Sequence, residues 1–389
     1  MPMKKATSLQ TKKHNRDLVL RTIFANASIS RAEVARATNL TRTTVSDVVN
    51  GLLLEGVVAE VGRGESRGGK TPILVSISAD SRFLIGLNLS QNKFVGAIVN
   101  LCGEIRERTE ICIDGADKQK ALESVYKILN DLLDKRLKPV VGIGIGTPGL
   151  INSREGIVIN AVNLDWHDLE LGKLLQEKYR LPVAILNDSQ ATAIGEYVYN
   201  HNYVQENNYI VVNVNQGIGS GIIINGRLFQ GDGGGAGEIG HVVVEKNGEL
   251  CRCGKRGCLE TISSTSAVLK KTGKCSIEEA ISAYEQNDST TCQVVTEAAN
   301  CLGRSLANMI SVLNIHTVIL TGDMVRFGEG WLNVVKTSVR EAVFSRMYEE
   351  TSIAVGRFGY DACILGAAAF LSFNDYSLIF LKDAEYSLP

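Results

Sequence analysis

The strongest constraint on the fold of this chain is a group of potential metal ligands within eighteen residues. The group consists of His241, Cys251, Cys253 and Cys258. One imidazole and three thiols form a Cys₃His set, which is a donor set typical of tetrahedral zinc, and the cysteines lie on a glycine-bearing turn. A structural zinc ion is therefore the expected cofactor. The alternative is a set of reduced cysteines packed as small apolar side chains, although the surrounding loop is polar, basic and rich in glycine.

Length and hydropathy narrow the class of protein. The chain has 389 residues, more than one ordinary hydrophobic core, so two or three domains are expected. No run approaches the roughly 18 apolar residues of a spanning helix, and the N-terminus has no apolar signal core. We therefore expect a cytoplasmic protein without a membrane partner, in which the other six cysteines are reduced.

The net charge of -1 hides an asymmetry between the two ends of the chain. Residues 1–72 contain 12 Lys and Arg against 6 Asp and Glu, a net charge of +6, whereas the remainder carries -7. A basic head on an acidic body indicates a polyanionic partner for the head alone.

The head, residues 1–80, has the pattern of a winged helix-turn-helix. Helices are expected over 15–24, 31–38 and 42–54, the second with a capping box from Ser30 to Glu33. The third is the candidate recognition helix, because its first turn is polar and rich in hydroxyl groups. The residues expected to reach a major groove are Thr41, Arg42, Thr43, Thr44, Ser46 and Asp47.

Strands expected over 57–61 and 73–77 flank a basic, glycine-rich wing. Arg67 and Lys70 lie in this wing and are expected to enter an adjacent minor groove of double-stranded DNA. Two alternatives remain at this stage: a flexible basic linker, or a three-helix domain with no role in DNA binding.

From residue 81 onward, strands alternate with helices. The pattern over 83–99, strand, polar turn, strand, recurs over 209–226, which predicts a duplicated α/β fold whose two lobes enclose a cleft. The expected lobes are residues 81–200 and 201–389. Helices over 290–313, 330–348 and 362–373 are expected to cover the second lobe, and residues 374–389 form an unassigned tail.

Polar residues between these units are candidates for lining the cleft. Asn163 and Trp166 share one loop, and Asp188 follows an apolar strand. Amides and carboxylates pair with sugar hydroxyl groups, and an indole can stack on a sugar ring. For Asp188 the alternative is a helix cap.

With these motifs assembled, the body resembles the ROK family of repressors, open reading frames and sugar kinases, which has an actin-like, ribonuclease-H-type fold. The repressor branch, which includes xylose and N-acetylglucosamine repressors, carries a winged helix-turn-helix ahead of this body. The resemblance implies that the Cys₃His set holds zinc. It also implies that a sugar contacts Asn163, Asp188, Glu238, His241 and Glu260, and that the match to Asp188 is the catalytic base in the kinases.

The chain departs from the kinases at the nucleotide motifs. The first phosphate turn begins at Asn88, where kinases have an aspartate, and it lacks their glycine. Magnesium that bridges ATP phosphates requires a carboxylate. The second motif has Asn215 and Gln216 in place of Gly and Thr, and the third has Asp323 and Met324 near the adenosine position. The sequence therefore predicts that sugar binding is retained and that ATP binding is lost.

These observations predict a sugar-responsive bacterial transcription factor, most simply a repressor, that is not an enzyme. A homodimer or dimer of dimers would bind a palindromic operator, and a monosaccharide would change its affinity for DNA. Two alternatives are a sugar kinase that uses Asp188 as its base, and a DNA-binding regulator controlled by a protein partner.

Overall fold

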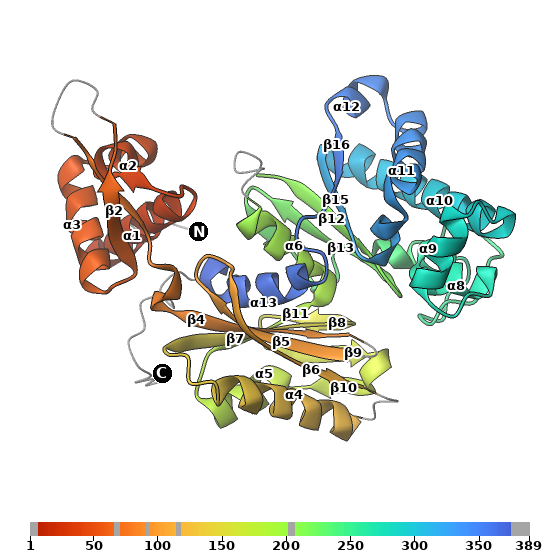
Figure 1. Ribbon diagram of the computed structural model, residues 1–389, viewed down its shortest axis with the longest axis horizontal. Coiled ribbons are helices and arrows are strands. Elements are labelled where there is room, and N and C mark those ends of the chain that lie inside the picture. Colours follow the sequence, from red (N-terminus) through yellow and green to blue (C-terminus); the bar gives the residue numbers. More distant parts are fainter. Residues whose placement is uncertain (1–6, 66–70, 91–92, 114–117, 201–206, 375–389) are drawn as a thin grey trace.

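The computed structural model describes residues 7–65, 71–90, 93–113, 118–200 and 207–374. Figure 1 shows a small N-terminal head beside a larger body that has two lobes. Among the described residues, no helix has the length and apolar character needed to cross a membrane.

The head is a winged helix-turn-helix. Its elements are α1 (Ser8–Phe24), β1 (Ile29–Ser30), α2 (Arg31–Thr38), α3 (Arg42–Leu54), β2 (Val58–Arg63) and β3 (Ile73–Ile77). The three strands form one antiparallel sheet in the order β1-β3-β2. The capping box of Ser30 and Glu33 is confirmed, and Thr41 caps α3.

The start of one helix in the head differs from the prediction. Helix α1 begins at Ser8 rather than at residue 15, because Thr7 and Gln10 form a second capping box ahead of the amphipathic part. The wing residues Arg67 and Lys70 lie outside the described residues.

The body contains two five-stranded sheets with the same topology, which confirms the predicted duplication. The first has the order β11-β7-β4-β5-β6 and the second β14-β13-β12-β15-β16. In each sheet the strand that comes first in the sequence, β4 or β12, lies in the centre. The two strands on one side of it are joined by antiparallel pairing, and the two on the other side by parallel pairing.

The strands of the first sheet are β4 (Phe83–Leu89), β5 (Lys93–Asn100), β6 (Ile105–Cys112), β7 (Val140–Thr147) and β11 (Val183–Asn187). The strands of the second are β12 (Tyr209–Val214), β13 (Ile218–Ile224), β14 (Arg227–Phe229), β15 (Thr317–Thr321) and β16 (Ser352–Val355). A small antiparallel sheet that was not predicted consists of β8 (Leu150–Asn152), β9 (Ile157–Ala161) and β10 (Trp166–Leu169).

Helices cover the outer faces of both sheets. On the first sheet these are α4 (Lys118–Leu133) and α5 (Leu171–Tyr179). On the second lobe they are α7 (Glu260–Ser263), α8 (Thr265–Thr272), α9 (Ile277–Glu285), α10 (Ser289–Leu313), α11 (Gly328–Ala342) and α12 (Ser345–Glu349). The predicted continuous helix over 330–348 is thus two helices, separated at Val343 and Phe344, two residues of low helix propensity.

Two helices lie between the sheets, α6 (Asp188–Tyr199) and α13 (Asp361–Asn374) (Figure 1). Their buried residues share one cluster with the inner faces of both sheets. They cross closely, since a Cβ on Gly366 would overlap the carbonyl oxygen of Ala191. The prediction that residues 362–373 cover the second lobe was wrong: α13 packs on β4 and β7 of the first sheet, whereas α6 packs on β12 and β13 of the second. The nearly uniform apolar character of α13 gave no preferred face.

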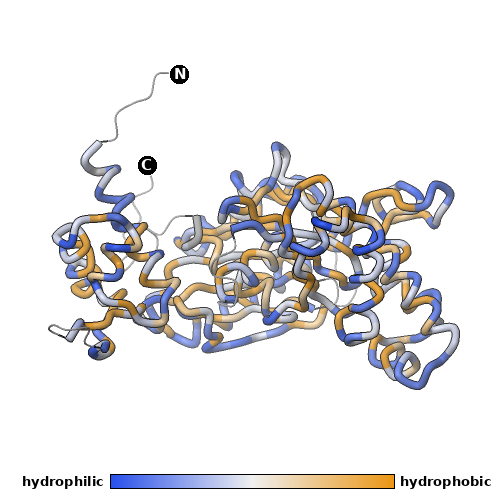
Figure 2. The backbone as a smooth tube through the Cα atoms, turned by 90° about the horizontal axis from the view of Figure 1, so that it is seen from above, coloured by the Kyte–Doolittle hydropathy of each residue, from blue (hydrophilic) through white to orange (hydrophobic). Residues whose placement is uncertain are grey.

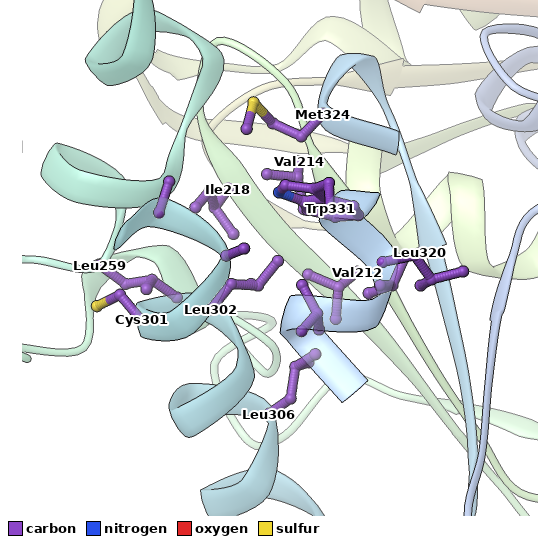
Figure 3. Packing of buried hydrophobic residues seen from close by; sticks show 14 of the residues in the cluster. Val212, Val214, Ile218, Leu259, Cys301, Leu302, Leu306, Leu320, Met324 and Trp331 are labelled. Carbon is purple, nitrogen blue, oxygen red and sulfur yellow. The ribbon is translucent and has the colours of Figure 1, made fainter. Parts of the chain in front are cut away.

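The apolar stretches of the chain lie mainly inside the body, and hydrophilic stretches follow its outer turns (Figure 2). In the second lobe, Figure 3 shows α10 presenting Leu302 and Leu306 toward Val212 on the sheet, with Trp331 beside Val214. Helix α10 is therefore the main cover of the second sheet.

This packing predicts a contrast between two valines of α10. Val295 is 1% exposed in the core, whereas Val312 is 82% exposed. Val295→Ala should lower the free energy of unfolding by about 1.5–3 kcal/mol, and the matched change Val312→Ala should alter it by less than about 0.5 kcal/mol. Urea denaturation of both variants measures this difference, and equal losses would contradict the described packing of α10.

Candidate functional site

A cleft of about 920 Å³ lies between the two lobes. Four residues of the predicted sugar set line it: Asn163, Asp188, Glu238 and His241. Glu260, the fifth, is not in the lining and is only 7% exposed.

Trp166 is a correction to the prediction of an indole in the cleft. Its side chain is fully buried in the core of the first lobe, and its indole N–H donates to the carbonyl of Lys118. The local spacing of the loop did not reveal this, because β10 pairs with β9 and directs the ring inward.

The floor of the cleft is formed where β11 ends and α6 begins. Asn187 caps α6, accepting hydrogen bonds from the backbone N–H groups of Ser189 and Gln190. Asp188 is the first residue of the helix and lines the cleft, and its Oδ1 accepts the backbone N–H of Ser189 over 2.7 Å. Burial raises the pKa of Asp188, and hydrogen bonds from Ser189 oppose that shift.

Glu238 lies across the cleft from Asp188. Burial, reinforced by the negative charges of Asp188 and Glu260, raises the pKa of Glu238 to about 7. Near neutral pH this side chain can therefore accept hydrogen bonds as a carboxylate or donate one as an acid. The site is thus rich in acceptors that suit hydroxyl groups.

The four predicted metal ligands come together in one cluster. One donor atom from each of His241, Cys251, Cys253 and Cys258 lies within 4.8 Å of the others. His241 Nδ1 is 3.5 Å from Cys251 Sγ, and the sulfur atoms of Cys253 and Cys258 are 3.6 Å apart. Zn–S bonds of about 2.3 Å in a tetrahedron place sulfur atoms about 3.8 Å apart, so the donor spacing fits a zinc-sized ion.

The imidazole of His241 faces both the metal cluster and the cleft. Nδ1 points to the thiols, whereas Nε2 lies 3.9 Å from Glu238 Oε2. Burial lowers the pKa of His241, which favours the neutral ring that binds a metal. A metal on Nδ1 would therefore fix the ring that Nε2 presents to the cleft.

Two residues at positions that differ from the kinase nucleotide motifs, Asn215 and Asp323, contact each other in the lining of the cleft. The backbone N–H of Asp323 donates to Asn215 Oδ1 over 2.7 Å, and the hydroxyl of Tyr360 donates to Asp323 Oδ1. Met324, next to Asp323, is fully buried in the core. A hydrogen bond thus joins two of the three altered motifs, and Tyr360 adds a further contact to Asp323.

Helix α6 also reaches the head. Tyr199, near its end, packs edge to face on Phe24 at the end of α1, with the ring centroids 6.2 Å apart. The β5–β6 turn packs closely on the ring of Tyr199, since a Cβ on Gly103 would lie 2.6 Å from this ring. Leu101 of this turn is buried in the core of the head. Helix α6 is therefore one connection between the cleft and the head.

Further contacts hold the head to the body. The N–H of Leu101 donates to the carbonyl of Ala79, and the N–H of Ser78 donates to the carbonyl of Val57. Arg82 is 7% exposed, and its guanidinium reaches the carbonyl of Glu55 at the end of α3. The head is therefore held to the body by packed contacts as well as by the covalent linker between them.

The recognition helix presents the predicted residues on its outer side. Thr41, Arg42, Thr43 and Asp47 are exposed, while Thr44 and Ser46 are partly exposed. Thr44 contacts Thr41 through both its N–H and its hydroxyl group.

Several cleft residues were missed from the sequence. Arg252, in the basic loop that carries the cysteines, was not among the predicted cleft residues, yet it lines the cleft. Arg108 also lines it and forms an ion pair of 2.7 Å with Asp361 at the start of α13. Tyr360 is a third. Arg108 and Tyr360 come from segments without a recognisable motif, and the motif that contains Arg252 indicated a metal site and gave no sign of the cleft.

Comparison with known proteins supplies the family. A family model described as "ROK family" matches residues 84–373. The chain belongs to the ROK family. A second model, described as "Winged helix-turn-helix DNA-binding", matches residues 16–59.

Named relatives extend this ROK assignment. The chain is 33% identical to the xylose repressor of Caldicellulosiruptor bescii, over 94% of this chain and 98% of the relative. It is 28% identical to the glucokinase of Halalkalibacterium halodurans, over 76% of this chain and 97% of the relative. A crystal structure of a ROK family transcriptional regulator, a homolog of E. coli MLC protein, matches with a TM-score of 0.82 and 25% identity, covering 95% and 98% of the two chains.

Proposed function

We propose that this ROK protein is a sugar-responsive transcriptional repressor whose head binds an operator and whose cleft binds a monosaccharide. The observation that carries the proposal is helix α6, which has Asp188 in the cleft at one end and Tyr199 on the head at the other. The helix has 12 residues and is about 18 Å long. It offers a short, direct route between the two sites.

The cleft has the chemistry of a sugar site. Asn163, Asp188 and Glu238 supply amide and carboxylate groups, and His241 adds a ring nitrogen. Such groups pair with the hydroxyl groups of a neutral sugar. The similarity to a xylose repressor makes D-xylose the first sugar to test.

The sugar acts because it binds one arrangement of the two lobes more tightly than another. Hydroxyl groups that bridge Asp188 of α6 and Glu238 of the second lobe favour one arrangement of the lobes over another. Helix α6 is buried between both sheets, so a change in the lobes moves its end at Tyr199 relative to the head. Coupling of this kind typically amounts to about 1–3 kcal/mol, or about 5- to 150-fold in affinity for DNA.

The head binds double-stranded DNA through α3. Thr41, Arg42, Thr43, Thr44, Ser46 and Asp47 contact the major groove, and the wing residues Arg67 and Lys70 contact the minor groove. A homodimer presents two such helices to the halves of a palindrome. In this arrangement the sugar controls how the two heads are held relative to each other.

Zinc has a structural role in this proposal. His241, Cys251, Cys253 and Cys258 fill four coordination positions, which leaves none open for chemistry. The ion would rigidify the loop that carries Glu238 and His241 and thereby preform one side of the cleft.

The rival function is that of a sugar kinase with Asp188 as the base. Two observations argue against it: Asn88 stands where magnesium-bound ATP requires a carboxylate, and Asp323 and Tyr360 bind each other across the nucleotide side. A protein partner as the effector is the other rival, and it leaves the polar cleft without a role.

Operator binding in the presence of sugars tests the function. DNA selected from random duplexes by the full chain serves as operator, and fluorescence anisotropy measures its Kd with and without a panel of pentoses and hexoses that includes D-xylose. At least one sugar should weaken binding by fivefold or more. Identical Kd values with every sugar would contradict the sensor, and sugar-dependent ATP hydrolysis lost in Asp188→Asn would establish the kinase instead.

Substitution of a zinc ligand tests the metal cluster. Cys253→Ser should lose bound zinc and sugar affinity, because a structural zinc site contributes on the order of 10 kcal/mol in small zinc domains. Cys275→Ser, at an exposed cysteine outside the cluster, is the control and should retain both. Elemental analysis and calorimetry report the result, and unchanged zinc in Cys253→Ser would refute the ligand assignment.

The joint between α6 and the head provides a test of coupling. Tyr199→Ala should leave sugar affinity within about twofold and reduce the effect of sugar on operator Kd at least fivefold, because it removes the ring that contacts Phe24. Tyr199→Phe should keep the effect.

Tyr179→Ala is the matched control for Tyr199→Ala. It removes a tyrosine whose ring packs on Tyr126, on the outer helices of the first lobe. The operator Kd is measured with and without sugar for Tyr199→Ala, Tyr199→Phe and Tyr179→Ala, and only Tyr199→Ala should lose the effect of sugar. An undiminished sugar effect in Tyr199→Ala would show that the signal takes another route.

A further inference from the structure

The positive charge of the head is concentrated at its start. Residues 1–16 contain no Asp or Glu and have a net charge of +5. The basic residues of this stretch are Lys4, Lys5, Lys12, Lys13 and Arg16. Residues 17–72 contain 7 Lys and Arg and 6 Asp and Glu, a net charge of +1. Most of the net charge that the head presents to a polyanion therefore lies in its first 16 residues.

The first two turns of α1 carry part of this charge outside the core of the head. Lys12, Lys13 and His14 are exposed, and among the described side chains the helix first enters the core at Val19. Figure 2 shows the start of α1 projecting from the rest of the head. Lys12 has no ion-pair partner among the described residues. These turns therefore present basic side chains to solvent or to a partner.

A capping box orders these turns, although they bury none of the described side chains. Thr7 Oγ1 accepts the backbone N–H of Gln10 over 3.2 Å, and Gln10 Oε1 accepts the backbone N–H of Thr7 over 2.8 Å. Short helical segments are marginal in water when packing does not stabilise them. The sequence thus holds two lysines on an ordered helix at a place where the head gains no core from them.

We propose that Lys12 and Lys13 bind phosphate groups of the operator, as a third contact with double-stranded DNA beside the recognition helix and the wing. DNA is the partner that this surface fits, because the segment has positive charges and no acidic residue before Asp17. The contact lies outside the residues expected to read the grooves. This inference rests on the proposed binding of DNA by α3.

Helix α1 lies beside the recognition helix. It packs on both α2 and α3, and Arg16 forms an ion pair with Glu55 at the C-terminal cap of α3. Lys12 is one helical turn before Arg16, about 6 Å along the axis. The major groove of B-DNA is about 12 Å wide and is bordered by the phosphates of both strands. Basic side chains next to a helix in this groove are therefore close to the DNA backbone.

Phosphate contacts differ from base contacts in what they contribute. They fix the register of a protein on the duplex but read no sequence. Each phosphate that a lysine neutralises releases counterions, so the logarithm of the association constant falls with the logarithm of the salt concentration by about 0.9 per contact. Lys12 and Lys13 thus add affinity for operator and for random DNA alike, and they increase the dependence of both on salt.

Removal of the two charges tests this contact. The full-length variant Lys12→Gln/Lys13→Gln keeps helix-forming side chains, and its Kd for the selected operator and for a random duplex is measured between about 50 and 200 mM salt. Both Kd values should rise by about tenfold at the low end of this range. The slope against salt should fall by about 1.8 in magnitude, because two phosphate contacts are lost.

Two further variants serve as controls. Lys12→Arg/Lys13→Arg keeps the charge and should keep both the Kd and the slope. Lys120→Gln/Lys127→Gln removes the same charge from exposed positions of α4 on the first lobe and should behave like the wild-type chain. Thermal unfolding and sugar affinity should be unchanged in all three variants, because none of these lysines belongs to a core or lines the cleft.

An unchanged salt slope in Lys12→Gln/Lys13→Gln would overturn the proposal, whatever happens to the operator Kd. A loss of affinity confined to the selected operator would also contradict it, because that result indicates base reading. Failure of this inference can be told apart from failure of the proposed function. A wild-type chain that selects no DNA overturns both, whereas a wild-type chain that binds its operator, with the same salt slope in the variant, overturns only the role of α1.

Discussion

The burial of α6 between two sheets is the constraint on which the rest of this structure depends. Its residues pack on the inner faces of both lobes, and it crosses α13 at glycines that permit close contact. Close-packed interfaces of this kind repack between discrete arrangements and deform little. We therefore propose that α6 moves as one rigid unit, so that its end at Asp188 in the cleft and its end at Tyr199 on the head shift together when the lobes move.

The same body fold can support catalysis or regulation, and local chemistry decides between them. The cleft contains the carboxylates and the imidazole that we propose bind a sugar, beside a potential metal cluster, and Asp323 and Tyr360 bind each other where the resemblance would place a nucleotide. Glu196 of α6 accepts backbone hydrogen bonds from Arg357 and Phe358, and so ties α6 to the segment that carries Tyr360.

Much of this architecture could be predicted from the sequence because its signals are local. Capping boxes located α2, the repeat of strand, turn and strand revealed the duplicated sheets, and ligand spacing identified the cluster around His241. The failures concern long-range direction. The sequence does not show that Trp166 turns into the core of the first lobe or that α13 packs on the first sheet. These outcomes depend on packing between segments far apart in the chain.

The central claim is that sugar in the cleft is sensed at the head through α6, and hydrogen–deuterium exchange of the full chain with and without sugar tests it most directly. The account predicts that sugar changes the exchange of amides in the cleft and also at the joint, in the segments around Phe24, Leu101 and Tyr199. Changes confined to the cleft, with operator affinity nevertheless falling, would contradict it.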